Sequence, residues 1–205
     1  MRKLFSYNII ILFLLSGCGF ITISQRIVTL KSDNPLLYKF NEIIDFENIQ
    51  NGDIDDAVTY VINESDQILS TVLAIIHTER TFENTLVKLD DLYNAVFKVW
   101  NLIELLSSTH PSESIRGEAD NNDILIQEYM VDLSMNEDLY EAILIYSNSK
   151  EAQTLSLDKR RFIQSELKDF KRSGMELKGI KRNMLKEIQT HLTELSIAFS
   201  NNITS

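Results

Sequence analysis

Apolar side chains recur at alternating steps of four and three residues between positions 82 and 103, and this spacing constrains the fold more than any other feature of the sequence. The stripe consists of Phe82, Leu86, Leu89, Tyr93, Val96, Trp100 and Ile103. Such steps place side chains on one face of an α-helix. Three heptads predict a helix of about 25 residues, and therefore about 37 Å long, that packs on other helices. Charged residues do not flank the whole stripe as they do in a coiled coil, so the pattern favours a helix within a bundle.

The same helical spacing of apolar residues occurs in five further segments. Only two prolines and six glycines interrupt the 205 residues, and residues suited to cap helix N-termini precede four of the six segments. The six predicted helices run from Asp53 to Ile76, from a cap at Thr81, from a cap at Ser112 to about Val131, from a cap at Asn136, from a cap at Ser156 to a stop at Gly174, and from Glu176 to Phe199. The sequence therefore predicts an all-α fold, a multi-helix antiparallel bundle of about six helices.

The N-terminus has the pattern of a bacterial lipoprotein signal. Two cations, Arg2 and Lys3, precede an apolar run at residues 9–15, which is too short to span a bilayer. The small residues of Ser16-Gly17 then lead to Cys18. We expect residues 1–17 to be a signal peptide and Cys18 to be lipidated, the alternative being a buried or free thiol. We further expect residues 18–33 to form a lipid-anchored tether and residues 34–205 to form the helical domain.

The predicted lipid anchor places the protein in the bacterial cell envelope, attached to a membrane through Cys18. No aspartate follows Cys18, and this absence favours the outer membrane over the inner one. Cys18 is the only cysteine, so the chain cannot form an internal disulfide.

Charge is distributed unevenly along the chain, whose formal net charge is −10. Acidic residues dominate from Asp33 to Glu141, whereas basic residues are in excess from Lys150 to Glu194. An acidic body repels the phosphates of nucleic acid, so we expect no nucleic-acid partner. The basic stretch is compatible with anionic lipid or RNA, but we favour solvated helix faces that dock on acidic neighbours.

No residue pattern in the sequence supports catalysis, cofactor binding or metal binding. The three histidines, His77, His110 and His191, do not form the i, i+4 pair of a helical zinc site. His191 and Glu194 lie one turn apart, where we expect a solvated helix edge. The adjacent pairs at 55–56 and 90–91 point to different helical faces, so they are poor acid–base dyads. The aromatic residues Tyr93, Phe97, Trp100 and Tyr140 could line a peptide groove, but their helical spacing favours core positions.

Several short stretches follow one another in a fixed order across residues 34–203. They are Asn34-Pro35-Leu36-Leu37, Asp45-Phe46-Glu47-Asn48-Ile49, Thr81-Phe82-Glu83-Asn84-Thr85-Leu86, His110-Pro111-Ser112-Glu113 with Ile115-Arg116 and Glu118-Ala119, Leu139-Tyr140, Phe170-Lys171-Arg172-Ser173-Gly174 with Leu177, and Leu185-Lys186-Glu187-Ile188 with Leu192, Leu195, Phe199 and Asn202. In this order they resemble the thimet oligopeptidase, oligopeptidase A and peptidyl-dipeptidase family of zinc metallopeptidases. The segment 41–52 is shorter than in that family and lacks its usual prolines.

The resemblance implies part of the N-terminal lobe of an all-helical, two-lobed enzyme whose deep channel cuts short peptides. The family's HExxH zinc helix and its later glutamate ligand lie far downstream of the matched region, and no position here corresponds to them. We therefore expect a truncated or split relative with no catalytic residue, no cofactor and no peptidase activity of its own. Its expected partners are the membrane, through Cys18, and a separate catalytic chain or a peptide.

A second function is compatible with the sequence. The alternative to an oligopeptidase fragment is a non-enzymatic envelope lipoprotein that binds a peptide or a protein.

The resemblance also predicts an exposed surface on the last helix. In the resembled family, helices of this lobe also pack on the catalytic lobe. We therefore expect the last predicted helix to expose apolar surface, so that the isolated domain self-associates, binds a hydrophobic dye or requires a partner chain.

Overall fold

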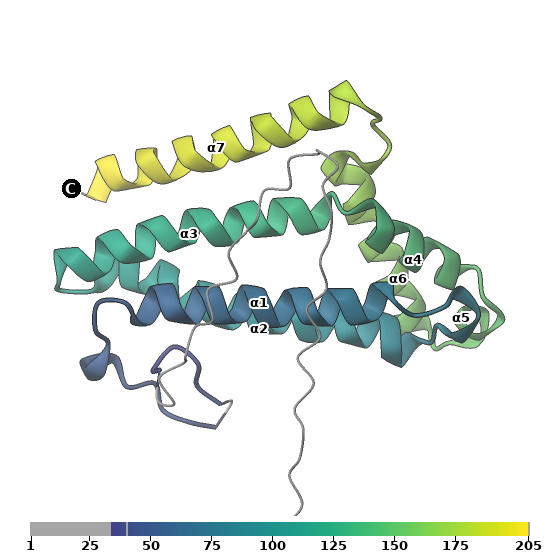
Figure 1. Ribbon diagram of the computed structural model, residues 1–205, viewed down its shortest axis with the longest axis horizontal. Helices are drawn as coiled ribbons and strands as arrows, with labels where there is room; N and C mark the ends of the chain where they lie inside the picture. The colour runs from purple at the N-terminus through teal and green to yellow at the C-terminus, as the bar shows by residue number, and fades with distance from the viewer. Residues whose placement is uncertain (1–33, 40, 205) are drawn as a thin grey trace, which may run out of the picture.

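The computed structural model describes residues 34–39 and 41–204, and this part of the chain is all-α, with seven α-helices and no β-strand. Figure 1 shows the helices α1 (Asp53–Leu73), α2 (Lys88–Thr109), α3 (Glu113–Ser134), α4 (Glu137–Ser147), α5 (Lys150–Thr154), α6 (Leu157–Phe170) and α7 (Ile180–Thr204). The predicted fold class is confirmed. All six expected helices are present. The structure also contains a short helix that the sequence did not predict, α5, which the Ser149 hydroxyl caps. The predicted signal peptide and tether lie outside the described residues.

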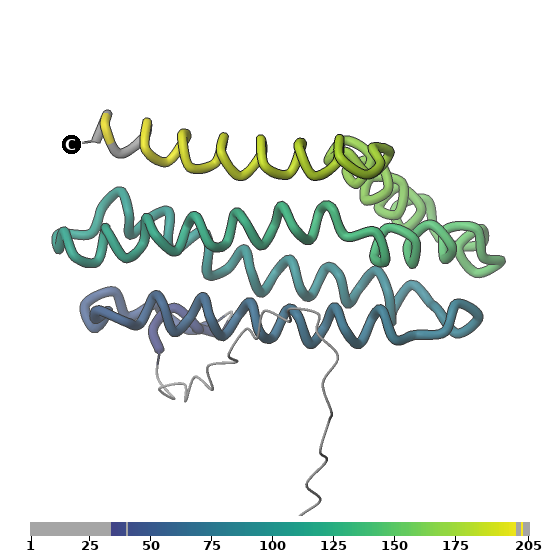
Figure 2. Tube along the Cα trace, turned by 45° about the horizontal axis from the view of Figure 1, so that its top comes forward, coloured from purple at the N-terminus to yellow at the C-terminus, as the bar shows by residue number. Residues whose placement is uncertain are grey.

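The long helices α1, α2 and α3 run in alternating directions and form the body of the bundle. Figures 1 and 2 both place α3 between α7 and the α1–α2 pair. The helices α4, α5 and α6 gather at the end of the bundle where α1 ends and α2 begins. None of the described helices is both long enough and apolar enough to cross a membrane.

The stripe that starts at residue 82 forms the centre of the core, as the sequence predicts. Thr81 caps this segment: its hydroxyl accepts a hydrogen bond from the Asn84 N–H at 3.1 Å, and the Asn84 side chain accepts one from the Thr81 N–H. The first turns, the π-helix η3 (Phe82–Val87), lead directly into α2. The helix α2 also buries a second set of side chains, because it packs on α1 and on α3: Leu92, Val99, Leu102 and Leu106.

Two helix boundaries differ from the predicted ones for identifiable reasons. The helix α1 ends at Leu73 and not at Ile76. The buried guanidinium of Arg80 donates a hydrogen bond to the Val72 carbonyl at 2.9 Å, which satisfies an end group of α1. The helix α7 begins at Ile180 and not at Glu176, because Gly174 and Gly179 both adopt left-handed backbone angles (φ 96° and 56°) before it.

The predicted caps divide into two groups. The Asn136 side chain accepts a hydrogen bond from the Leu139 N–H at 2.9 Å and caps α4 as expected. Ser112 and Ser156 occupy the predicted positions before α3 and α6, but their side chains make no capping hydrogen bond. Gly174 marks the predicted stop: α6 ends at Phe170, and a π-helical turn, η4 (Lys171–Met175), carries the chain to the reversal.

Candidate functional site

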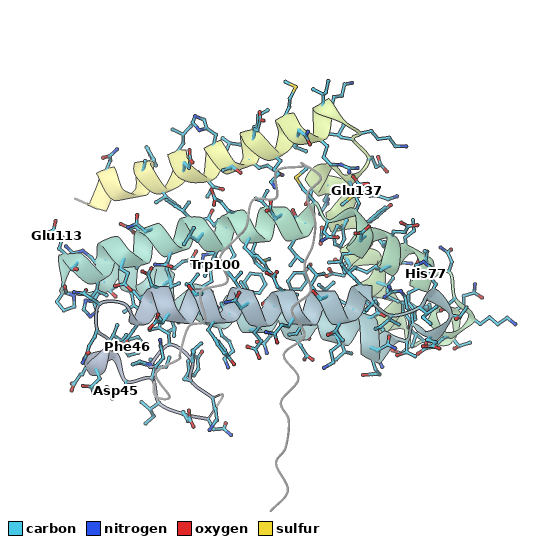
Figure 3. The ribbon with its side chains drawn as sticks, viewed as in Figure 1. Asp45, Phe46, His77, Trp100, Glu113 and Glu137 are labelled. Carbon is cyan, nitrogen blue, oxygen red and sulfur yellow. The ribbon has the colours of Figure 1, made fainter. Side chains whose placement is uncertain are left out.

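The one predicted site residue, Cys18, lies outside the described residues, so its lipidation stays a prediction. The three histidines are on separate elements: His77 begins the short helix η2 (His77–Glu79), His110 follows α2, and His191 lies in α7. His77 and Glu113, the first residue of α3 just beyond His110, lie at opposite ends of the bundle in Figure 3. His77 and His110 therefore do not share a site.

The described residues do not fit the zinc ion that the resemblance implies. Among residues 34–39 and 41–204, no three His, Cys, Asp or Glu side chains are placed to hold a metal ion. His191 Nδ1 lies 3.1 Å from a Glu194 carboxylate oxygen on an exposed edge of α7, as predicted. His110 Nδ1 accepts a hydrogen bond from the Ser112 N–H. We therefore derive no zinc-dependent step from these side chains.

The aromatic residues of α2 pack along the helix and do not form an open groove. The Phe97 ring stacks on Trp100 with a centroid distance of 5.7 Å, and Tyr93 lies 6.2 Å from Phe97. The Trp100 indole N–H donates to an Asp123 carboxylate oxygen at 2.6 Å, which ties α2 to α3. Tyr93, Trp100 and Tyr140 are partly buried against the core, which confirms the core interpretation for these three; Phe97 is more exposed.

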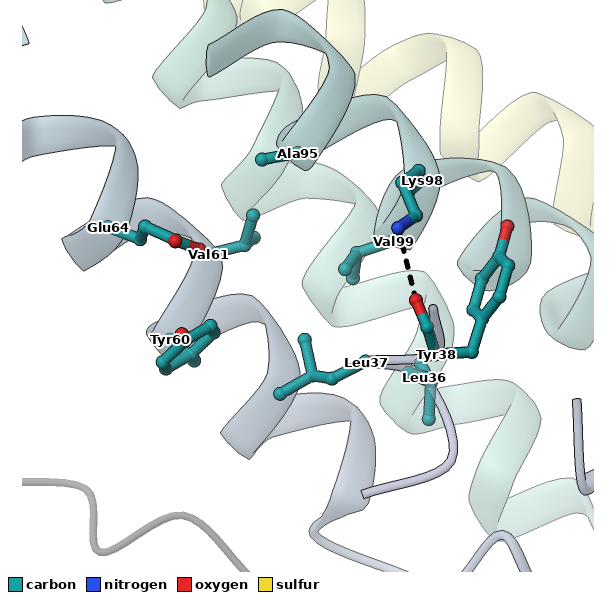
Figure 4. Close-up of a pocket in the computed structure, with 9 residues that line it drawn as sticks. All are labelled: Leu36, Leu37, Tyr38, Tyr60, Val61, Glu64, Ala95, Lys98 and Val99. Carbon is teal, nitrogen blue, oxygen red and sulfur yellow. Dashed lines mark hydrogen bonds between the residues drawn. The ribbon is translucent and has the colours of Figure 1, made fainter. Parts of the chain in front are cut away.

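A small pocket lies where the N-terminal segment crosses α1 and α2 (Figure 4). Its volume is about 210 Å³, and Leu37, Tyr60, Glu64 and Lys98 are among its lining residues. The Lys98 ammonium donates to the Tyr38 carbonyl at 3.0 Å and lies 4.9 Å from the centroid of the Tyr38 ring. This cation is thus engaged by the chain itself, and the pocket serves to hold residues 36–38 on the helices.

A half-buried carboxyl group lies between α2 and α6. The Tyr93 hydroxyl donates a hydrogen bond to Glu166 at 3.3 Å. Burial raises the pKa of Glu166, and the nearby carboxylates of Asp169 and Asp90 raise it further. Burial also raises the pKa of Tyr93. These carboxyl groups are not placed to hold a metal ion in the described part of the chain, so we assign the Tyr93–Glu166 pair to helix packing.

The most unusual surface is the outward face of α7, which we call the α7 apolar face. It consists of Ile180, Met184, Ile188, Leu192, Leu195 and Phe199, each between 53% and 78% exposed. Steps of three and four residues align these side chains along about 28 Å of helix. None of the described side chains from residue 180 to residue 199 is buried. This helix therefore presents an apolar stripe to solvent, as expected from the family resemblance.

Polar contacts hold α7 to the bundle on a different side. Arg182 forms an ion pair with Glu137 at the start of α4 and donates a hydrogen bond to the Met175 carbonyl at 3.0 Å. Lys186 forms an ion pair with Asp132 near the end of α3. On one edge of the α7 apolar face, Glu187, His191 and Glu194 follow one another at helical spacing. A shallow pocket on this face combines Glu187 and His191 with Ile188, Leu192 and Leu195.

Comparison with known proteins identifies the domain. Residues 58–182 match the family described as Neurolysin/Thimet oligopeptidase, N-terminal domain. Similar curated proteins include a thimet-like oligopeptidase from Dictyostelium discoideum, 30% identical over 141 residues. Oligopeptidase A from Haemophilus influenzae is 29% identical and that from Escherichia coli is 28% identical, each over 170 residues.

The matched region is a small part of each relative. It covers 67% of this chain and 21% of the Dictyostelium protein, and 83% of this chain with 24% and 25% of the two bacterial proteins. The chain thus spans about a quarter or less of the length of these relatives.

Proposed function

The chain belongs to the neurolysin/thimet oligopeptidase family through its N-terminal domain, and from this premise we propose that it is a helical lobe of an oligopeptidase that does not hydrolyse peptides by itself. The zinc-bearing residues would be supplied from outside these 205 residues, either by a separate chain or by further polypeptide. The lobe would then form one wall of the space in which a short peptide is held.

The distribution of chemical groups supports this proposal. Hydrolysis by a helical zinc site needs two histidines at i, i+4 and a glutamate to activate water. The sequence contains no HExxH, and the described acidic and histidine side chains do not converge on one point. The single observation that carries the proposal is the family match over residues 58–182, because it connects this domain to proteins named as oligopeptidases.

Complementation tests the proposal. The purified protein is assayed with a quenched fluorescent peptide, alone and after mixing with an oligopeptidase A from which the corresponding N-terminal region has been removed. We expect no hydrolysis by the chain alone and chelator-sensitive hydrolysis in the mixture. Chelator-sensitive hydrolysis by the chain alone would contradict the proposal. A mixture no more active than its parts would leave the alternative function, a non-enzymatic envelope lipoprotein that binds a peptide or protein, as the better description.

We also propose that Cys18 carries a lipid anchor and that the protein is held at the envelope of a bacterium, in the outer membrane. The support is the spacing of Arg2, Lys3, the apolar run 9–15 and Ser16-Gly17 ahead of Cys18. Cells are labelled with a fatty-acid analogue and the protein is recovered. We expect Cys18→Ser to accumulate as an unprocessed precursor without label, whereas Ser16→Ala retains both processing and label. Undiminished labelling of Cys18→Ser would refute lipidation at this residue.

A further inference from the structure

The α7 apolar face points away from the rest of the bundle. Lys186, which forms an ion pair with Asp132 of α3, lies two residues from both Met184 and Ile188, and two residues correspond to about 160° around a helix. The apolar side of α7 is therefore opposite the side that attaches it to α3. Figures 1 and 2 both place α7 in an outer layer, with α3 between it and the α1–α2 pair. A flat surface can thus meet the stripe without a rearrangement of the helices.

This face needs a cover, because an aligned run of six exposed apolar side chains is unfavourable in water. The buried core cluster contains no residue of α7. The attachments of α7 to α3 and α4 include two ion pairs. An occupant of the face has to accept apolar side chains along about 28 Å of helix, and it has to match the charges around them.

Exposed cations surround the start of the α7 apolar face. Residues 168–181 contain five basic and two acidic residues, all of them exposed. The two carboxylates form ion pairs with Lys171 and Arg172 at 3.7 and 3.4 Å. Among the described residues, no ion pair joins Lys168, Lys178 or Lys181 to a carboxylate. Three cations near the start of α7 therefore lack a counter-charge in this part of the chain.

Lys181 belongs to the apolar side of α7 itself. It lies three residues before Met184 and seven before Ile188, which places the three side chains on one side of the helix. Lys178 lies two residues before Ile180, the first member of the stripe. An apolar stripe bordered by lysines is typical of a helix that lies in the plane of a membrane interface. The apolar side chains of such a helix enter by about 5–10 Å, and its cations remain at the lipid headgroups.

A second copy of α7 does not supply the missing counter-charge. In a parallel pair of helices, the lysines at the two starts meet each other. In an antiparallel pair they meet residues 195–204, which contain no charged residue, and the Glu187 and Glu194 edges of the two copies also face each other. Like charges that face each other at an interface are destabilising. An anionic bilayer, in contrast, matches both the apolar stripe and the cations.

We propose that the α7 apolar face docks on the surface of an anionic lipid bilayer. The helix lies parallel to the membrane plane, its apolar side chains enter the boundary between headgroups and acyl chains, and Lys178 and Lys181 contact lipid phosphates. Glu187 and Glu194 lie about a right angle away from the middle of the stripe and stay in water. This contact goes beyond the proposed function. It requires neither zinc chemistry nor a lipid on Cys18, so its test can fail or succeed separately from theirs.

Flotation of residues 34–205 with vesicles tests this contact. The domain contains the entire buried core cluster, from Leu36 to Met175, and is therefore tested as a folded unit. Because residues 1–33 are absent, neither the apolar run 9–15 nor Cys18 contributes to binding. The vesicles consist of phosphatidylcholine, alone or with about one third phosphatidylglycerol. We expect the domain to bind the anionic vesicles at least about tenfold more tightly than the neutral ones, with a difference that shrinks at high salt.

Charge variants test the role of the lysines. Lys178→Gln with Lys181→Gln should remove most of the preference for anionic vesicles. The matched control is Lys150→Gln with Arg160→Gln, which makes the same change in net charge at exposed positions of α5 and α6. This control should keep the preference, because its positions lie outside the border of the α7 apolar face.

An environment-sensitive fluorophore locates the contact within the domain, which contains no cysteine of its own. The fluorophore is attached to Leu192→Cys, within the α7 apolar face, or to Gln67→Cys, an exposed position on α1. With anionic vesicles we expect a blue-shifted emission that spin-labelled acyl chains quench at residue 192 and not at residue 67. In the unlabelled domain, Ile188→Gln with Leu192→Gln should weaken flotation at least about tenfold, while thermal unfolding by circular dichroism stays cooperative.

Several outcomes would overturn the proposal. Absence of flotation with both kinds of vesicle would do so, and so would flotation that either the lysine pair or the apolar pair of substitutions leaves unchanged. An equal response of the fluorophore at residues 192 and 67 would show that the domain binds lipid through another surface. A dimer that persists in the presence of vesicles and does not float would identify a second copy as the occupant of the face.

Discussion

At the scale of single residues, Glu118 of α3 makes a polar contact with the start of α1, 66 positions earlier in the sequence at Gly52. Its carboxylate accepts hydrogen bonds from the backbone N–H groups of Gly52, Ile54 and Asp55 at 3.0–3.1 Å. These donors belong to the start of α1, where N–H groups have no partner within the helix and the helix dipole favours a negative charge. One side chain of α3 therefore caps α1 and fixes the relative position of the two helices.

This contact predicts a clear loss of stability on neutralisation. Glu118→Gln keeps the size of the side chain but removes the charge and one acceptor oxygen. We expect the free energy of unfolding in urea to fall by about 1–2 kcal/mol. Glu104→Gln, which neutralises an exposed carboxyl inside α2, is the control and should change the free energy of unfolding by less than about 0.5 kcal/mol. Equal effects of the two substitutions would show that Glu118 does not act as a cap.

Glu166 gives the opposite prediction, because its folded-state pKa is raised above the ordinary value of 4.5. The folded protein holds this proton more tightly than the unfolded chain, so stability falls as pH rises through the interval between the two pKa values and stays lower above it. Glu166→Gln cannot ionise and can still accept the Tyr93 hydrogen bond. We expect it to raise the melting temperature at pH 7 by about 1–3 °C, with the gain vanishing below pH 4.5. An equal gain at pH 4 and pH 7, or no gain at pH 7, would contradict the assignment.

Local signals and distant contacts differ in how well the sequence predicts them. Thr81 and Asn136 act as caps as predicted, because the groups that they bind lie three residues away. The sequence does not predict the roles of Glu118 and Arg80, since their partners lie 66 and 8 residues away and no local spacing connects them. The tract 120–122 looks weak for a helix, yet α3 continues through it, because Asn122 is buried and donates to Asp55 at 2.6 Å. A tertiary contact overrides the local propensity there.

At the scale of elements, the reversal between α6 and α7 contains two glycines with left-handed backbone angles, and Gly174 is the one with no room for a Cβ. Gly174 has φ 96°, and a Cβ at this position would overlap the Leu185 side chain. Gly117 is the natural control, because it lies inside α3 and an added methyl group there would meet open space. We expect Gly174→Ala to lower the free energy of unfolding by about 1–3 kcal/mol, and Gly117→Ala to raise it by up to about 1 kcal/mol. Two effects of the same sign, measured by urea unfolding, would contradict this description of the reversal.

The helices α2 and α7 show the limit of periodicity as a predictor. Both carry apolar residues at steps of three and four. In α2 most of the stripe is buried because α1 and α3 pack on it, whereas in α7 every member of the stripe is more than half exposed. Spacing predicts that a helix has an apolar face, but only the positions of neighbouring helices determine whether that face is covered. The expectation of an exposed last helix rests on the family resemblance and not on the pattern itself.

At the scale of the whole molecule, the described domain has a complete core and one incomplete surface. The buried cluster extends from Leu36 to Met175 and uses every long helix except α7. Changes on the α7 apolar face should therefore alter association without altering the core. We expect residues 34–205, which lack the segment 19–33, to bind a hydrophobic dye and to self-associate. Ile188→Gln with Leu192→Gln should reduce both signals severalfold, since these side chains lie at the centre of the face and are more than half exposed.

The control for this prediction is the core itself. The double variant should keep the cooperative thermal unfolding of residues 34–205, whereas Val96→Ala, at a fully buried site in α2, should lower the unfolding free energy by about 1–3 kcal/mol without reducing dye binding. Sedimentation, dye fluorescence and circular dichroism separate the two outcomes. A monodisperse, dye-negative domain with a sharp melt would show that the α7 face needs no cover, and the domain would then be a self-contained module. Loss of the cooperative melt in the double variant would instead show that α7 belongs to the core.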